Sequence, residues 1–293
     1  TPTVQLTVEQ LKAAGGISIT ASHNSEEWNG LKFINKDGVF FDLIENKKLE
    51  KAEKFGVFNF SNQPNIIDII NDKDAINNHI KTILGIPLYS DDSYKKIKNR
   101  KFKIVVDAVN SSGSKAIPSL LKALGCEVVE LFCDESGKFP HAPEPINENL
   151  KLLAEKVKKV NADLGIAVDP DADRLVLIDE NGEPIGEERT IVLAIESVLS
   201  NIDKFKITTK SPIVVVNQST TRAVDDVCKK YGAILERSAV GEINVVKTMK
   251  KNKAVIGGEG SGGVILPACH YGRDSLVGVA LILHHLATNS LTL

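Results

Sequence analysis

Three carboxylates stand at alternate positions in the segment 169–174, which reads Asp-Pro-Asp-Ala-Asp-Arg. The segment follows the apolar run 164–168, and alternate side chains of extended backbone point to one side. Carboxylates placed in this way would repel one another strongly without a cation between them. Oxygen ligands of this kind suit Mg²⁺ or Ca²⁺, so we interpret Asp169, Asp171 and Asp173 as a metal-binding loop. We reject an EF-hand because its sixth position requires glycine, where this chain has Arg174.

A second segment, 17–32, brings a hydroxyl group to the end of a short apolar run. It reads ISITASHNSEEWNGLK, with Ser22 and His23 near its centre. In open α/β sheets, ligands bind beyond the carboxyl ends of the strands. Turn chemistry alone would also explain Ser-His-Asn at this place. The serine-hydrolase reading is weak because the motif G-x-S-x-G is absent.

A third segment, 257–263, reads GGEGSGG and formally contains G-x-G-x-x-G. A dinucleotide fingerprint must open a helix, whereas residues 264–267 continue as a strand, so we reject nucleotide binding. A glycine-rich hairpin is one interpretation. In the other, Glu259 and Ser261 serve as acceptor and donor for neighbouring hydroxyl groups, while the glycines let a ligand approach the backbone.

The elements that must position these loops follow an alternating strand–helix pattern, which favours an α/β fold. We predict successive three-layer α/β/α domains with mixed, mainly parallel sheets. Strands are expected at 16–20, 102–107, 128–132, 164–168, 175–178, 213–216, 233–237 and 254–257, and helices at 117–124, 149–160, 220–231 and 241–251.

Polar stretches near 88–101 and 200–212 indicate the joints between domains. We therefore expect a partial domain at 1–97, a second domain at 98–203 and a third at 204–293. The basic run 95–101 is interpreted as a solvated linker before a strand. The first segment carries a helix-entry pattern at 1–5 and one confident strand, which together cannot bury a sheet.

The amino-acid composition argues against nucleic-acid-binding and membrane-spanning proteins. The chain has 293 residues, 42% hydrophobic and 25% charged, with a formal net charge of −2. This balance is typical of a soluble globular protein and argues against nucleic acid as a partner. The longest apolar candidate, 276–283, is far shorter than the ~20 residues that span a bilayer, so no membrane is expected. Four cysteines without CxxC spacing predict reduced thiols in a cytoplasmic protein.

The remaining histidines lack evident partners in the sequence. We therefore treat His79, His141, His284 and His285 as structural or surface residues. The oligomeric state is not indicated by the sequence.

Taken together and in this order, the three loops resemble those of the α-D-phosphohexomutases. Residues 20–24 resemble the family's phosphoserine loop, 169–174 its metal loop and 258–262 its sugar-recognition loop, and the similarity covers essentially the whole chain. The resemblance implies that Ser22 bears a phosphoryl group and forms a site for one Mg²⁺ with the three aspartates. It further implies roles for six other residues: Arg174 steadies phosphoryl oxygens, Lys32 assists proton transfer, and Glu259, Ser261, Glu242 and Arg273 bind substrate.

The implied reaction is intramolecular phosphoryl transfer on a hexose or hexosamine phosphate, between the 6- and 1-positions. It runs through a hexose 1,6-bisphosphate, which also serves as activator. The segments 258–263 and 270–274, with Glu242, look closest to the phosphoglucosamine mutase branch; the alternative is phosphomannomutase/phosphoglucomutase. Two departures are Ser25, where the family often has proline, and Gly263, where other branches have histidine.

Two rival functions stay open at this point. An aspartyl-phosphate phosphatase would use Asp169 as nucleophile and Asp171 as acid, and a sugar-phosphate-binding module would keep the loops without turnover. The family's N-terminal strands and its C-terminal, phosphate-gripping domain have no counterpart in the sequence. Loss of that grip removes binding energy, so we expect this chain to be poorly active or inactive.

Overall fold

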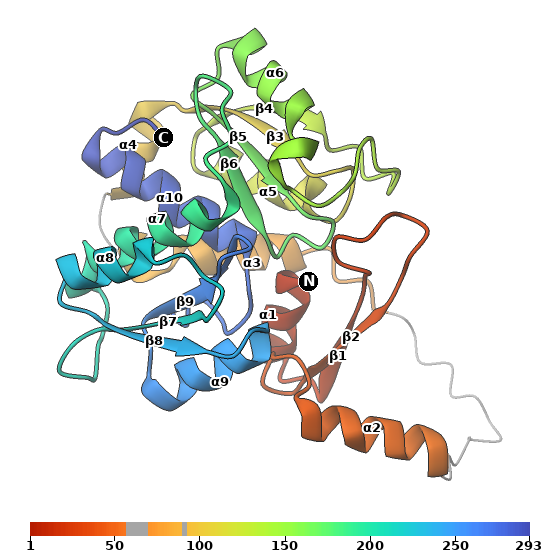
Figure 1. The fold of residues 1–293 in the computed structure, drawn as a ribbon. Helices are drawn as coiled ribbons and strands as arrows, with labels where there is room; N and C mark the ends of the chain where they lie inside the picture. The colour runs from red at the N-terminus through yellow and green to blue at the C-terminus, as the bar shows by residue number, and fades with distance from the viewer. Residues whose placement is uncertain (57–69, 90–92) are drawn as a thin grey trace.

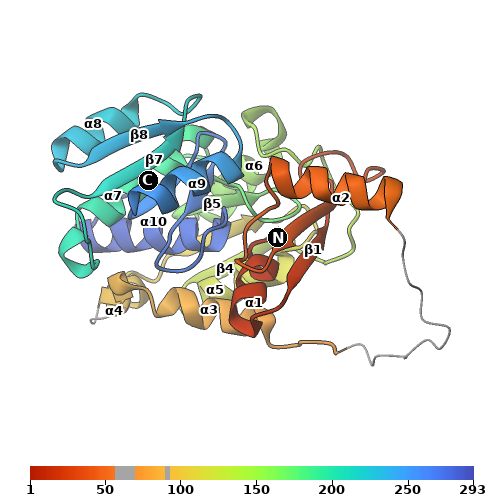
Figure 2. The same cartoon turned by 90° about the horizontal axis from the view of Figure 1, so that it is seen from below.

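The computed structural model describes residues 1–56, 70–89 and 93–293 (Figure 1). The first part contains α1 (Pro2–Leu11), β1 (Gly15–Ile19), β2 (Leu31–Asn35), α2 (Leu43–Phe55) and α3 (Ala75–Leu84). The predicted strand at 16–20 is confirmed as β1, but it has a partner that the sequence did not indicate. β1 and β2 pair antiparallel, with Ser18 opposite Lys32. Helix α2 projects from this pair, and none of its residues is buried (Figures 1 and 2).

The second sheet has the strand order β4-β3-β5-β6. Strand β3 is parallel to β4 and β5, and β6 runs antiparallel at the edge. Strands β5 and β6 coincide with the predicted ranges 164–168 and 175–178. The elements are β3 (Lys103–Asp107), α5 (Gly113–Ala123), β4 (Glu127–Phe132), α6 (Lys151–Val160), β5 (Leu164–Val168) and β6 (Leu175–Ile178), with a short 3₁₀ turn at Asn147–Asn149.

The third sheet repeats this build in the order β8-β7-β9-β10. Strand β7 is parallel to β8 and β9, and β10 is the antiparallel edge. Mixed, mainly parallel sheets of an α/β fold are therefore confirmed. The elements are β7 (Ile213–Asn217), α8 (Ala223–Lys230), β8 (Ile234–Ser238), α9 (Glu242–Asn252), β9 (Ile256–Glu259) and β10 (Gly263–Ile265), preceded by a 3₁₀ turn at Ile202–Lys204.

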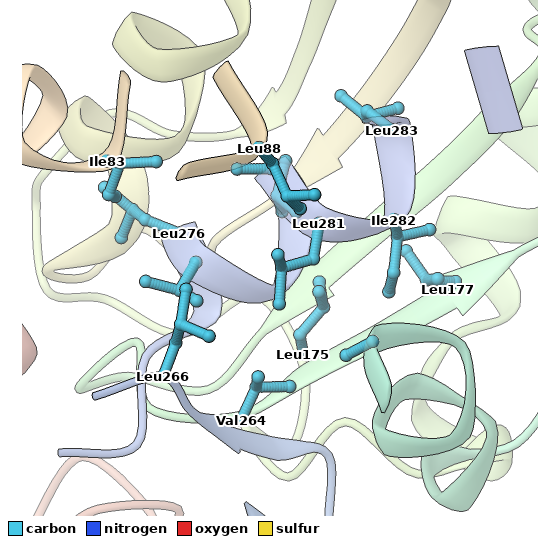
Figure 3. Close-up of a cluster of buried hydrophobic side chains, with 14 of the residues drawn as sticks. Ile83, Leu88, Leu175, Leu177, Val264, Leu266, Leu276, Leu281, Ile282 and Leu283 are labelled. Carbon is cyan, nitrogen blue, oxygen red and sulfur yellow. The ribbon is translucent and has the colours of Figure 1, made fainter. Parts of the chain in front are cut away.

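The C-terminal helix α10 (Ser275–Asn289) lies in the core that the two larger sheets share (Figure 3). Its Leu281 and Ile282 belong to the same buried cluster as Leu177 of β6 and Val264 of β10. Ile83 of α3 and Leu88 of the 3₁₀ turn Pro87–Tyr89 close the cluster (Figure 3). The apolar run 276–283 is thus a core helix, and no described helix meets the length and apolarity that crossing a membrane requires.

The interpretation of residues 95–101 as a solvated linker was wrong. Residues Ser93–Arg100 form helix α4, and Ile97 on its inner face is fully buried against the core. Tyr94 of the same helix is partly buried against this core, while Lys96 and Lys98 are exposed. The domain boundaries at 97 and 203 stay a prediction: α4 and α7 (Glu187–Leu199) both pack against α10.

Candidate active site

The aspartate loop leaves β5 at its carboxyl end, and all three carboxylates are buried. One oxygen from each of Asp169, Asp171 and Asp173 lies within 4.8 Å of the others. Asp169 Oδ1 accepts hydrogen bonds from two backbone N–H groups of its own loop, at 3.1 and 3.0 Å. Each aspartate also has one buried oxygen without a hydrogen-bond partner in the described part of the chain. Three such oxygens in one place fit a hard divalent cation, which prefers oxygen ligands.

The surroundings shift the pKa values of Asp169 and Asp171 in opposite directions. Burial, and then the neighbouring carboxylates Asp173 and Asp171, raise the pKa of Asp169 well above its usual range. Burial acts in the same direction on Asp171, but the Lys32 ammonium, 2.5 Å from Asp171 Oδ2, holds the pKa of that carboxyl below its ordinary value. A cation among the three oxygens would relieve the repulsion that Lys32 offsets only in part.

Ser22 follows β1 in a left-handed backbone conformation, with φ of 56°. Its N–H donates to Thr20 Oγ1 at 2.9 Å, which holds the turn closed. A left-handed conformation costs a non-glycine residue roughly 1–2 kcal/mol. Other contacts in the fold must therefore offset the cost of this backbone conformation at Ser22. Ser22 and Asp171 line one cleft, together with Thr20 and Ser112. The structure therefore brings the first and second loops together.

His23 lies beside Ser22 and Glu144 is linked to it through Arg174, and neither side chain was given a role by the sequence. His23 Nδ1 lies 3.4 Å from Ser22 Oγ and accepts a hydrogen bond from Arg174 at 3.1 Å. Arg174 also donates to Glu144 Oε1 at 3.3 Å. Glu144 stands between two prolines in the loop after β4, and that setting was its only signal in the sequence. Glu144, Arg174 and His23 thus form a polar chain that ends at the serine.

Lys32 lies on β2, whose pairing with β1 sets it beside the strand that leads to Ser22. Its ammonium lies 2.5 Å from Asp171 Oδ2 and 3.5 Å from Asp173 Oδ2. Burial opposes the charge of Lys32, but the two carboxylates outweigh it and raise the pKa of the ammonium. The role of Lys32 in proton transfer, implied by the family resemblance, stays a prediction.

Arg273 joins the metal loop to the third loop. Its guanidinium donates to Asp173 Oδ2 at 2.7 Å, to Glu259 Oε2 at 2.8 Å and to Glu242 Oε2 at 3.1 Å. The three carboxylates and Arg273 are all buried. Burial lowers and the carboxylates raise the pKa of Arg273, with a net rise well above its usual value. Arg273 is therefore a central ion-pair partner within the protein.

The carboxylates predicted to bind sugar are held by protein groups. Glu259 Oε1 accepts from Asn217 at 2.9 Å and from the backbone of Gly241 at 3.1 Å, and Glu242 Oε1 accepts from Gln5 at 3.1 Å. Ser261 lies in the turn between β9 and β10 and is partly exposed. Binding of a ligand by Ser261, Glu259 and Glu242 stays a prediction.

Gly263 makes room for Arg273. A Cβ atom at this position would lie 2.3 Å from Cδ of Arg273, so any larger residue would displace the guanidinium. The preceding Gly262 has φ of 90°, and its carbonyl accepts a hydrogen bond from the N–H of Leu175 at 3.1 Å. The third loop is a glycine-rich hairpin that docks on β6, and its glycines serve this docking and the arginine.

Models of one protein family match most of the chain. They are described as phosphoglucomutase/phosphomannomutase, alpha/beta/alpha domains I, II and III, and they match residues 1–54, 79–182 and 187–293. The chain is also 36% identical over 284 residues to a phosphoglucomutase/phosphomannomutase of Thermococcus kodakarensis, covering 96% of this chain and 59% of that protein. The chain belongs to the phosphoglucomutase/phosphomannomutase family.

Other relatives bear a second name. A probable phosphoglucosamine mutase of Methanopyrus kandleri is 32% identical, with 96% of this chain and 59% of that protein covered. A phosphoglucosamine/phosphogalactosamine mutase of Sulfurisphaera tokodaii is 30% identical over 296 residues, with 100% of this chain and 62% of that protein covered. The chain thus spans about three fifths of the length of the curated relatives it matches.

Solved structures of the family share the fold. A phosphoglucomutase/phosphomannomutase family protein of Burkholderia thailandensis aligns with a TM-score of 0.76 at 29% identity, over 94% of this chain and 56% of that chain. A putative phosphomannomutase of Thermus thermophilus aligns with a TM-score of 0.82 at 22% identity, over 99% and 63%. The resemblance to α-D-phosphohexomutases that the three loops indicated is therefore confirmed.

The view that His79 and His141 lack partners was wrong. His79 Nε2 lies 2.8 Å from Asp274 Oδ2, and His141 Nε2 lies 2.8 Å from Asp107 Oδ2. The partners stand 195 and 34 positions away in the chain, a separation across which the sequence offers no pattern. The four cysteines are free thiols, as their spacing predicted.

Proposed function

We propose that this chain carries the phosphoryl-transfer centre of a phosphohexomutase, with Ser22 as the residue that gives and receives the phosphoryl group. The observation that carries the proposal is the cleft that Ser22 shares with Asp171, one of three buried aspartates that each keep an oxygen without a hydrogen-bond partner among the described residues. Phosphoryl transfer needs positioning and charge neutralisation more than covalent help. A cation held by the aspartates, together with Arg174, would supply the charge neutralisation.

Asp169, Asp171 and Asp173 would hold one Mg²⁺, together with an oxygen of the phosphorylated Ser22. A bound Mg²⁺ would neutralise charge on the transferred group. Their buried, unpartnered oxygens support this assignment, because each is an acceptor that the protein leaves unused. The other oxygen of Asp173, Oδ2, would stay hydrogen-bonded to Arg273, which orients the carboxylate.

Arg174 would steady the phosphoryl oxygens, and its hydrogen bonds to His23 and Glu144 would hold its side chain near Ser22. In the first half-reaction the P–O bond to Ser22 Oγ breaks and a bond to a sugar oxygen forms. The sugar hydroxyl loses its proton, and Ser22 Oγ gains one. Lys32 lies next to the aspartates of this cleft and would take part in that proton exchange. The second half-reaction reverses these bonds at the other sugar oxygen.

The substrate that we propose is a hexosamine phosphate, converted between its 6- and 1-phosphates through a 1,6-bisphosphate that also acts as activator. Relatives named phosphoglucosamine mutase at 32% and 30% identity favour it. The relative at 36% identity is named phosphoglucomutase/phosphomannomutase, so glucose or mannose phosphate is the second candidate. We further propose that the protein acts in the cytoplasm, where its free thiols stay reduced.

The test is phosphorylation of the 293-residue chain by a bisphosphate donor. The protein is incubated with Mg²⁺ and either glucosamine or glucose 1,6-bisphosphate, and the intact mass is measured. We expect a gain of one phosphoryl group that requires Mg²⁺ and is faster with the glucosamine donor. Ser22→Ala should abolish the gain, and Ser25→Ala, a matched change in the same loop, should preserve it.

Two outcomes would contradict the proposal. A mass gain that survives Ser22→Ala would move the phosphoryl group to another residue and favour the phosphatase alternative. Binding of the bisphosphate without any mass gain, in the presence of Mg²⁺, would favour a sugar-phosphate-binding module.

A further inference from the structure

A second group of metal-ligating side chains lies outside the candidate active site. It consists of His79, Cys269, His270 and Asp274, and one donor atom from each lies within 4.8 Å of the others. His79 comes from α3, while the other three precede α10. The aspartate loop contributes none of the four. His79, His270 and Asp274 are at most 2% exposed, and Cys269 keeps part of its surface open.

Both imidazoles converge on one carboxylate oxygen. His79 Nε2 and His270 Nε2 lie 2.8 and 3.0 Å from Asp274 Oδ2. The other oxygen, Oδ1, accepts the N–H groups of Leu276 and Val277 and so caps α10. Asp274 can therefore offer Oδ2 to an ion while Oδ1 keeps its role at the helix start. Burial raises the pKa of Asp274, but the two histidines outweigh it and hold the pKa well below the usual value.

The surroundings resemble those of a ligating histidine. His79 Nδ1 lies 3.0 Å from Thr3 Oγ1, a hydroxyl that would accept the Nδ1–H of an imidazole bound to metal through Nε2. Ligating histidines usually have such a partner at the other ring nitrogen. His270 Nδ1 is buried and has no hydrogen-bond partner among the residues that the structure describes. Of the two ring nitrogens of His270, Nε2 is thus hydrogen-bonded within the described chain and Nδ1 is not.

We propose that His79, Cys269, His270 and Asp274 form a binding site for one Zn²⁺-class ion. Two imidazoles, a thiolate and a carboxylate are the donors that Zn²⁺ prefers, at about 2.0–2.3 Å in tetrahedral geometry. Donor atoms in such a site are roughly 3.3–3.8 Å apart, so those of the cluster need only small shifts. The formal charges of the ion, thiolate and carboxylate cancel, which lowers the cost of a buried site.

Binding would require the Cys269 thiol to lose its proton and each imidazole to present an unprotonated Nε2 to the ion. The partly exposed Cys269 supplies the entry side. Mg²⁺ does not compete, because it prefers oxygen ligands and near-octahedral geometry. The ion would tie α3, and through Thr3 the helix α1, to the start of α10. It would therefore fasten the part of the chain that carries Ser22 to the common core.

The test uses Co²⁺ as a spectroscopic substitute for Zn²⁺, with the metal-free chain in excess Mg²⁺ to occupy the aspartate loop. We expect one tetrahedral Co²⁺ per chain with a thiolate-to-cobalt charge-transfer band, displaced by Zn²⁺. Cys269→Ser should remove the band and weaken Zn²⁺ binding at least tenfold. Cys133→Ser, a change at another partly exposed thiol, should leave both unchanged. Far-UV circular dichroism checks that each variant is folded.

A second measurement is protection of Cys269 from alkylation. Stoichiometric Zn²⁺ should slow its modification strongly in the parent chain, while Cys133 reacts at an unchanged rate. The proposal is overturned if Co²⁺ gives no thiolate band, if the band persists in Cys269→Ser, or if Zn²⁺ leaves the alkylation of Cys269 unchanged. None of these results depends on phosphorylation of Ser22, so the outcome is independent of the proposed activity.

Discussion

Arg273 shows how strongly single residues of the site depend on one another. Its guanidinium donates hydrogen bonds to the buried carboxylates of Asp173, Glu242 and Glu259, at 2.7–3.1 Å. A buried ion pair adds little net stability, because desolvation offsets the attraction, but removal of one partner leaves a charge without compensation. The arginine therefore matters most for what its loss would leave behind, namely three buried carboxylates at the junction of the metal loop and the hairpin.

We predict that Arg273→Met lowers the free energy of unfolding by about 3–5 kcal/mol at pH 8. Burial already raises the pKa of Glu242, and loss of the guanidinium would raise it further. The folded variant would then bind more protons than its unfolded chain, so its stability should fall as pH rises from 5 to 8. Urea denaturation at both pH values measures this. The exposed Arg222→Met is the control, and an equal loss in the two variants would contradict the account.

Gly263 gives a second prediction at this scale. Gly263→His places a Cβ where Arg273 Cδ lies 2.3 Å away, so the side chain of Arg273 must move. We expect a loss of about 1–3 kcal/mol in the free energy of unfolding, as for other overpacked sites. Gly85→Ala is the control, since its new Cβ would lie 3.4 Å from the nearest backbone oxygens, those of Lys81 and Thr82. An unchanged midpoint in urea for Gly263→His would show that the arginine does not need this space.

Elements with a plain apolar pattern were predictable, and those anchored by few residues were not. Strands Leu164–Val168 and Leu175–Ile178 are buried throughout, so their sequences are continuously apolar. Strand Leu31–Asn35 was missed because Lys32 and Asn35 interrupt its pattern, and Lys32 forms ion pairs with Asp171 and Asp173. Helix Ser93–Arg100 was missed because its fully buried Ile97 stands among basic residues.

The same contrast holds for the site. The aspartate spacing could be read from the sequence, because its three carboxylates lie within five positions of one another. The partners of Arg273 could not, because they include Asp173, 100 positions away. Glu144 likewise reaches Arg174 across 30 positions. Local chemistry is visible in a sequence, whereas contacts made by the fold are not.

Helix α4 provides the prediction at the element scale. Ile97→Ala should lower the free energy of unfolding by about 2–5 kcal/mol, because a fully buried side chain leaves a cavity. Lys96→Ala, one position away on the exposed side, should change it by less than about 0.5 kcal/mol. Urea denaturation followed by circular dichroism measures both. Equal effects would contradict the packing of α4 on the core and restore the linker interpretation.

At the scale of the molecule, two sheets of the same build share one core around α10. Leu281 and Ile282 of this helix lie in one cluster with residues of β6 and β10 (Figure 3). The metal loop precedes β6, and the third loop precedes β10. The common core thus sets the geometry between the two loops that Arg273 connects.

This arrangement predicts that the two sheets unfold together. Leu281→Ala should lower the protection of backbone amides in both β3 and β7 against hydrogen exchange, each by about 2–5 kcal/mol. Native-state exchange read by mass spectrometry measures the two strands separately. A loss confined to one sheet would show that the sheets are independent folding units and that α10 belongs to only one of them.

We propose that the phosphoryl group resides on Ser22, and peptide mapping of the phosphate tests this. The chain is incubated with Mg²⁺ and a hexosamine 1,6-bisphosphate before digestion. We predict phosphate on the peptide that contains Ser22, dependent on Mg²⁺ and absent in Asp171→Asn. Phosphate on Asp169, which hydroxylamine would release, or on any residue other than Ser22 would contradict it.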